Sequence, residues 1–205
     1  MASRGSTDTT LSFEQFLASL TEGTMVEASA INGIVNAEFL KGSNINNMTV
    51  RFEANAMAGF DNTVGFYEIT PTGGLANATI LAANVKTTPG PVAVTISDPA
   101  NTLGFFLVQN GANTIGAAEF AADQFDFVSD GSGGFDLTSQ SVVLSDVEVF
   151  FSHDITLNSD GMQHVLSGVS DDGNGALRIG FEDLLRSGGT SDDDFQDVIM
   201  YVDIT

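Results

Sequence analysis

Apolar and polar residues alternate along much of this chain. Between Met48 and Ala56, hydrophobic residues take every second position, and polar residues take the positions between them. A period of two predicts a β-strand with one buried face. Apolar runs separated by turn residues predict further strands at residues 64–69, 80–85, 92–96, 103–108, 125–128, 142–144, 147–151 and 198–204, and another just before Phe181. Short strands spaced about 8–12 residues apart favour an all-β sandwich.

Helical signals are few. Ser12 and Gln15 fit a helix N-terminal capping box, apolar residues follow on one helical face, and Gly23 supplies a stop. The pattern at residues 117–123 does not decide between a helical turn and a loop. We therefore predict an all-β fold: a single, jelly-roll-like β-sandwich with a few short peripheral helices. Residues 1–10 are expected to be a loose tag or linker. Residues 11–205 show no composition break or fixed repeat and are expected to form one domain.

Charge and cysteine content narrow the possible partners. The chain has 6 Lys and Arg residues against 27 Asp and Glu residues, giving a net charge of −21. This balance excludes nucleic acid and anionic membranes as electrostatic partners. No apolar run approaches the roughly 20 residues of a membrane span, so we expect no membrane insertion. The absence of cysteine excludes disulfides, zinc–thiolate sites and a thiol nucleophile.

The acidic residues concentrate near the C-terminus. Residues 182–197 contain Glu182, Asp183, Asp192, Asp193, Asp194 and Asp197, with Arg186 as the only base. Two carboxylates about 4 Å apart repel by roughly 4 kcal/mol at an effective dielectric near 20. Such a cluster must therefore point into water or hold a cation. An all-oxygen set suits a hard cation, and calcium tolerates irregular geometry better than magnesium does.

Two further acidic segments could add ligands. Asp171 and Asp172 lie in an Asp/Asn/Gly turn, and Asn158 and Asp160 lie in a second loop. Ordinary turn chemistry explains both segments equally well, and a solvated acidic loop remains the alternative at residues 182–197. The candidate metal ligands are Glu182, Asp183, Asp192, Asp194, Asp197, Asp171, Asp172, Asn158 and Asp160.

Signals for catalysis are weak. His153 and His164 flank the loop of residues 154–161 and are expected to make structural hydrogen bonds. No serine lies in a nucleophile elbow, no phosphate-binding glycine pattern occurs, and no Trp is present to line a sugar cleft. We predict that the protein is not an enzyme.

A series of motifs resembles one known family of domains. They are residues 62–67, 103–108, 151–154, 158–161 and 164–167, followed by Phe181 to Leu184 with Asp192, Asp194, Phe195 and Asp197. In this order they resemble the calcium-dependent peptide-binding domain of giant bacterial repeats-in-toxin adhesins. The resemblance covers most of the chain from about residue 45. Thr190-Ser191 and Gln196 depart from the usual closing pattern, but neither change removes a carboxylate.

The resemblance implies a function for the domain. It would be an extracellular module of a bacterial surface adhesin that uses several calcium ions and binds the C-terminal peptide ends of host-surface proteins. Glu182, Asp183, Asp192, Asp194 and Asp197 would be calcium ligands, and one ion would receive the carboxylate of the peptide. The domain would be a monomeric part of a larger chain. A calcium-dependent carbohydrate-binding module and a calcium-rigidified structural spacer are the alternatives.

Overall fold

The computed structural model describes residues 47–53, 58–88, 90–169 and 177–204, together with the single residues 25 and 42. The segment 1–10, the helix expected from Ser12, and the candidate ligands Asp171 and Asp172 lie outside the described residues. In the part of the chain that is described, no helix is both long and apolar enough to cross a membrane.

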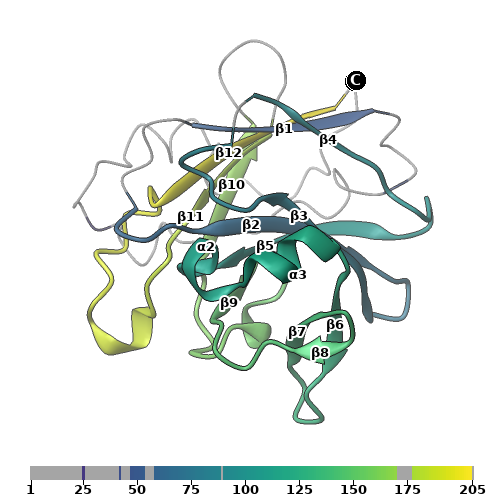
Figure 1. The fold of residues 1–205 in the computed structure, drawn as a ribbon. Helices are drawn as coiled ribbons and strands as arrows, with labels where there is room; N and C mark the ends of the chain where they lie inside the picture. The colour runs from purple at the N-terminus through teal and green to yellow at the C-terminus, as the bar shows by residue number, and fades with distance from the viewer. Residues whose placement is uncertain are drawn as a thin grey trace.

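The described chain forms three antiparallel sheets. The first has the strand order β10-β11-β12-β1-β4, the second β3-β2-β5-β9 and the third β6-β7-β8. Figure 1 shows them as three layers, with the four-stranded sheet in the middle. Their bounds are β1 Met48–Phe52, β2 Thr63–Ile69, β3 Leu75–Ala82, β4 Val92–Val94, β5 Thr102–Val108, β6 Phe125–Ser129, β7 Phe135–Ser139, β8 Val142–Val143, β9 Val149–Phe151, β10 Val165–Val169, β11 Leu177–Phe181 and β12 Val198–Ile204.

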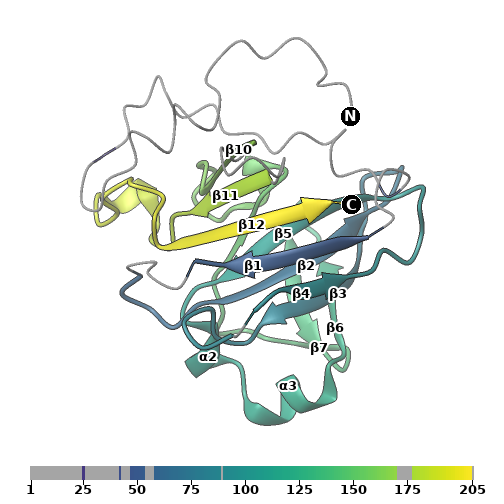
Figure 2. The same ribbon diagram turned by 90° about the horizontal axis from the view of Figure 1, so that it is seen from above.

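Short helices lie between the strands. They are α2 Gly111–Thr114, α3 Ala117–Ala122, the 3₁₀ turn η3 Ile155–Leu157 and the 3₁₀ turn η4 Arg186–Gly188. Helices α2 and α3 lie at one end of the sandwich, beside the middle sheet (Figures 1 and 2). The undecided segment 117–123 is therefore helical, with Asp123 in the left-handed conformation at its C-terminus.

The main core fills the space between the five-stranded and four-stranded sheets. Alternate residues of β1 and β12 point into it, among them Met48, Val50, Met200 and Val202, which are at most 2% exposed. They meet Phe105 and other side chains of the middle sheet. Burying the inward face of each strand removes apolar area from water, worth about 25 cal/mol per Å². The predicted all-β sandwich with short peripheral helices is confirmed.

The middle sheet is buried on both faces. Its second face packs against β6 and β7 in a separate core that contains Tyr67, Phe106, Phe127 and Leu137. A strand covered on both sides reads as a continuous apolar run rather than an alternating one, as residues 103–108 do. Gly104 makes this packing possible, because a Cβ at that position would lie 2.5 Å from the Tyr67 ring.

Several strands differ from the sequence-based prediction, and two of them, β7 and β10, were not predicted. Strand β3 begins at Leu75 rather than Ile80, with Asn77 in a left-handed conformation inside it. The first half of β3 consists mostly of Ala and Asn, which do not produce the alternation of large apolar and polar residues that predicts a strand. Strand β7 was not predicted; it pairs with β6 across the loop of residues 130–134. Asp130 shapes that loop by accepting hydrogen bonds from the Ser132 and Gly134 N–H groups at 2.7 and 2.9 Å.

Candidate metal centre

The predicted acidic residues lie in the connection between β11 and β12. Phe181 and Val198 are the last paired residues of this antiparallel hairpin, so the sheet fixes both ends of the connection. Glu182 and Asp183 directly follow β11, and Asp197 directly precedes β12. Asp192 and Asp194 lie on the returning arm, beyond η4. This connection, residues 182–197, is called the acidic hairpin loop here; it projects from one edge of the sandwich in Figure 1.

Five carboxylates of the acidic hairpin loop form two groups. Glu182, Asp192 and Asp194 make an outer group, and Glu182, Asp183 and Asp197 make an inner group. Within each group, one ligand oxygen per residue lies within 4.8 Å of the others. Glu182 belongs to both groups. Asp192 is exposed, whereas Glu182, Asp183 and Asp194 are at most 1% exposed. The structure thus brings together the five ligands that the closing motif predicted.

Glu182 is a buried carboxylate without ordinary partners. Its side chain is fully shielded from water, and neither carboxylate oxygen makes a hydrogen bond of normal geometry. Burial raises the pKa of Glu182 to about 7, and the charges of Asp192 and Asp183 add to the rise. The Ser191 hydroxyl and the Leu184 N–H oppose it only in part. A buried, unpaired carboxylate is costly, so this site calls for a proton or a cation.

Asp183 and Asp197 lie together in the inner group. The Asp183 N–H donates to Asp197 Oδ2 at 2.8 Å. Burial and the neighbouring charge of Asp183 raise the pKa of Asp197 to about 9, and burial raises the pKa of Asp183. Two carboxylates this close do not both ionise readily without a cation.

A buried arginine shapes the returning arm of the loop. Arg186 Nε donates to Asp193 Oδ1 at 2.5 Å and Nη1 donates to the Gln163 carbonyl at 2.9 Å. Its guanidinium also lies over the Phe195 ring, 5.2 Å from the centroid. Arg186 is thus paired with Asp193, which belongs to neither carboxylate group. Asp193 and Phe195 adopt left-handed backbone conformations, with φ of 56° and 59°. Backbone strain of this kind is held by surrounding contacts and often marks a functional site.

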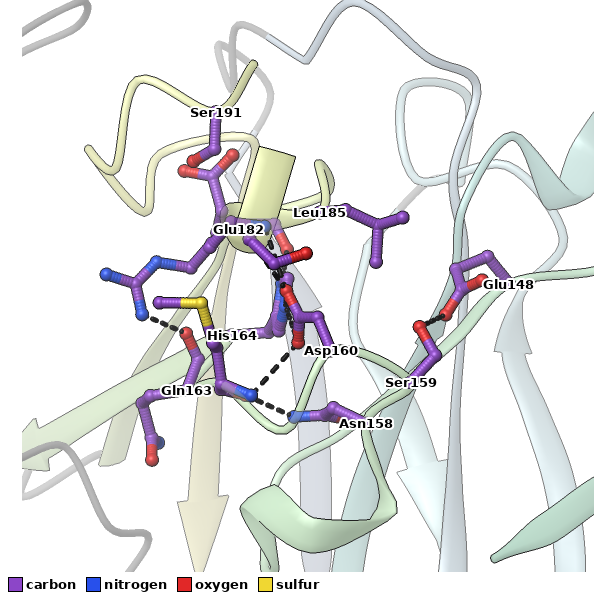
Figure 3. A network of polar contacts seen from close by, with 12 residues as sticks. Glu148, Asn158, Ser159, Asp160, Gln163, His164, Glu182, Leu185 and Ser191 are labelled. Carbon is purple, nitrogen blue, oxygen red and sulfur yellow. Dashed lines mark hydrogen bonds and ion pairs between the residues drawn. The ribbon is translucent and has the colours of Figure 1, made fainter. Parts of the chain in front are cut away.

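His164 and Asp160 support the loop from below (Figure 3). His164 Nε2 lies 3.1 Å from both carboxylate oxygens of Asp160, and the ring stacks on Phe150 with centroids 3.9 Å apart. Asp160 also accepts hydrogen bonds from the backbone N–H groups of Met162, Arg186 and Ser187. Burial opposes ionisation of Asp160, but these donors together lower its pKa. The network anchors η4 to the sheet.

Asn158 and Asp160 are not in either carboxylate group. Asn158 is buried; its side-chain oxygen accepts from the Phe151 N–H at 2.7 Å and its amide donates to the Met162 carbonyl at 2.8 Å. Their assignment as metal ligands stays a prediction, as does that of Asp171 and Asp172. The other histidine, His153, pairs with the Tyr67 hydroxyl through Nδ1 at 2.5 Å.

Two residues of the opposite sheet reach the site and were not predicted. Asn62, just before β2, donates to Asp183 Oδ2 at 2.6 Å, and its own side-chain oxygen accepts from the Asn110 N–H at 3.0 Å. Gln109, just after β5, donates to the Asp183 carbonyl at 2.5 Å. Asn62 is the first residue of the motif at residues 62–67, one of those on which the family resemblance depends. That motif was the only feature of the sequence that could have indicated a role for Asn62.

The donor set fits a hard divalent cation. Its donors are carboxylate oxygens, and a buried residue at its centre lacks hydrogen-bond partners, as expected for an ion ligand. Comparison with known proteins gives one family match, described as Domain of unknown function (DUF4114), over residues 98–205. Neither the curated proteins nor the solved structures give a significant match.

Proposed function

This chain belongs to the DUF4114 family of domains of unknown function, and we propose that it is a calcium-binding β-sandwich domain used for extracellular recognition. The observation that carries the proposal is the Glu182 carboxylate, which is fully buried, makes no hydrogen bond of normal geometry and lies beside four other carboxylates. Glu182, Asp183, Asp192, Asp194 and Asp197 would hold the metal. Calcium would supply the positive charge that allows these side chains to be ionised together.

Calcium suits this site better than magnesium does. Magnesium requires near-ideal octahedral geometry and keeps several of its waters, whereas calcium accepts irregular sets of six to eight oxygens. The loop offers an irregular set of carboxylates from both of its arms, three of them almost fully buried. A cation here would tie the returning arm, through Asp192 and Asp194, to the strand ends. Calcium would thereby fix the shape of the acidic hairpin loop.

Thermal unfolding tests calcium binding directly. A ligand that binds only the folded state stabilises it by about 4 kcal/mol at a thousandfold excess over the dissociation constant. We expect a clearly higher melting temperature with calcium than with excess chelator. Asp197→Asn should reduce the difference, while the matched control Asp136→Asn, at an exposed position of β7, should retain it. Coincident curves with and without calcium in the unaltered protein would refute the proposal.

The recognition part of the proposal concerns the exposed side of the outer group. With a net charge of −21, the protein surface repels anions. Asp192 is exposed, so an ion in the outer group would face solvent and could accept an external carboxylate. This supports the binding of free peptide C-termini, as the family resemblance implies for an adhesin module on the bacterial surface.

Peptides with matched ends test this recognition. A peptide with a free C-terminus should bind in calcium, and its C-terminal amide should bind much more weakly, because charge-assisted contacts are about twice as strong as neutral ones. Chelator should abolish binding of the free acid. Binding of glycans instead would favour a carbohydrate-binding module, and binding of neither would favour a structural spacer. Equal affinity for acid and amide would refute direct coordination of the carboxylate.

A further inference from the structure

The inner and outer carboxylate groups share one member, Glu182. We propose that Glu182 bridges two calcium ions, an inner ion held with Asp183 and Asp197 and an outer ion held with Asp192 and Asp194. The proposal rests on the calcium-binding function and adds the number of ions in the loop and the role of each carboxylate.

The spacing of the carboxylates is the first argument. Calcium binds oxygen at about 2.3–2.6 Å, so two oxygens on one ion are at most about 5 Å apart. Each group of three meets this limit, since its ligand atoms lie within 4.8 Å of one another. The five carboxylates do not form one such group; they divide into two triads that meet at Glu182. One ion therefore fits either triad but not the whole set.

Charge gives the second argument. The five carboxylates carry −5 when ionised, so one divalent ion leaves −3 and two leave −1. Two dications repel each other, but a carboxylate between them offsets that repulsion, and metal pairs about 3.5–4 Å apart are an established arrangement in proteins. Two ions neutralise the cluster far better than one.

The hydrogen bonds of the individual oxygens give the third argument. Asp183 Oδ2 accepts a hydrogen bond from Asn62, and Asp197 Oδ2 accepts one from the Asp183 N–H. Each of these residues thus commits one carboxylate oxygen to a protein donor. Glu182 differs, because Oε1 and Oε2 are both buried and neither makes a hydrogen bond of normal geometry. A carboxylate with both oxygens available can bind one ion through each of them, whereas Asp183 and Asp197 each keep one oxygen for an ion.

Native mass spectrometry in calcium, which counts bound ions, tests the bridge through single substitutions. Asp192→Asn should lose the outer ion only and Asp197→Asn the inner ion only, so each count falls by one. The double variant should fall by two. Glu182→Gln should also fall by two, although it changes one residue. The control Asp136→Asn should keep the full count. Counting losses relative to the unaltered protein removes any contribution from ions bound elsewhere.

Several outcomes would overturn the bridge. If Asp192→Asn, Asp197→Asn and their double variant all lose the same single ion, the loop holds one calcium. If Glu182→Gln loses only one ion, Glu182 is a terminal ligand. If Glu182→Gln binds as many ions as the unaltered protein, Glu182 is not a required calcium ligand and the bridge is wrong. If Asp192→Asn, Asp197→Asn and their double variant also keep the full count, the loop binds no calcium and the proposed function fails as well.

Folding of the key variant is checked separately. Glu182→Gln removes a buried charge and should unfold at a higher temperature than the unaltered protein when both are calcium-free at neutral pH. If Glu182→Gln does not fold, the bound calcium ions are counted in Glu182→Asp instead. Its shorter side chain keeps the charge but should reach only one of the two ions, so its count should fall by one; retention of both ions would overturn the bridge.

Discussion

His164 and Glu182 are joined by two contacts across neighbouring segments of the chain. The Glu182 N–H donates to the His164 carbonyl at 2.9 Å, and His164 Nδ1 lies 3.1 Å from the Glu182 carbonyl oxygen. These contacts continue the β10–β11 ladder one step beyond its last pair, Val165 with Phe181. The backbone of Glu182 is therefore held at the base of the acidic hairpin loop, where its side chain is fully buried.

Replacing His164 should destabilise the protein strongly. His164→Ala removes a fully buried ring that stacks on Phe150 and leaves Asp160 without its imidazole partner. Cavity formation and a lost buried hydrogen bond together should cost about 2–4 kcal/mol. Urea unfolding in calcium measures the change. Val142→Ala, at a side chain 66% exposed, is the control and should stay within about 0.5 kcal/mol. Equal behaviour of the two variants would contradict an anchoring role.

The stability of the calcium-free protein should fall as pH rises from about 6.5 to 9. The folded-state pKa values of Glu182 and Asp197 are about 7 and 9, against ordinary values of 4.5 and 3.8. Between the ordinary and raised values, the folded state binds more protons than the unfolded chain does, so each rise in pH favours unfolding. Their stabilising effect is complete below the ordinary values and lost above the raised ones.

Urea unfolding in calcium-depleted buffer at several pH values between 6.5 and 9 measures this trend. Excess calcium should remove this fall in stability, because bound calcium keeps the carboxylates ionised in the folded state. Calcium also binds more tightly as pH rises, since its ligands must lose their protons. Asp160 and Glu68 have lowered pKa values and act oppositely below about pH 4.5. Burial lowers the pKa values of His153 and His164 from 6.5, so these two groups act oppositely below about pH 6.5. Stability that rises with pH in the calcium-free protein would contradict the prediction.

A single methyl group on β11 should disturb the returning arm of the loop. A Cβ at residue 180 would lie 2.5 Å from the Phe195 carbonyl oxygen, so Gly180→Ala must push this arm away from the strand. Phe195 directly follows Asp194, and we expect calcium affinity to fall at least tenfold in titration calorimetry. Gly188→Ala is the matched control in the same loop. Its Cβ would meet nothing closer than the Thr190 hydroxyl at 3.9 Å, and its affinity should be unchanged.

Asn62 should couple the metal site to the opposite sheet. Asn62→Ala removes the hydrogen bond to Asp183 and leaves the Asn110 N–H without its partner. Loss of these contacts should cost about 1–3 kcal/mol and weaken calcium binding, because Asp183 is no longer held in place. Urea unfolding and calcium titration measure the two effects. Asn113→Ala, an exposed asparagine, is the control. Unchanged calcium affinity in Asn62→Ala would show that Asp183 is positioned by its own hairpin alone.

Local patterns in the sequence predicted the acidic hairpin loop well. The alternating run of β12 and the clustered acids before it occupy one short stretch, so Asp192, Asp194 and Asp197 were bound to lie near a strand end. The supports of the site were not predictable in this way. His164 to Glu182, Arg186 to Gln163 and Asn62 to Asp183 are contacts between segments 18 to 121 residues apart. They depend on strand order, which hydrophobic periodicity does not contain.

The segment that carries the family similarity lacks strands of both main sheets. The family match begins at residue 98, whereas β1, β2, β3 and β4 all precede it. Strand β1 lies between β12 and β4, and β2 lies between β3 and β5, so a chain cut at residue 98 loses neighbours in both main sheets. The cut also removes Asn62 from Asp183. Residues 98–205 should therefore behave as half of a split protein that regains structure and calcium affinity when a fragment containing β1 to β4 is supplied in trans. Transplanting the acidic hairpin loop into another protein would require both halves of the sandwich. The family match begins at residue 98, whereas the sheets that support the loop begin with β1 at Met48.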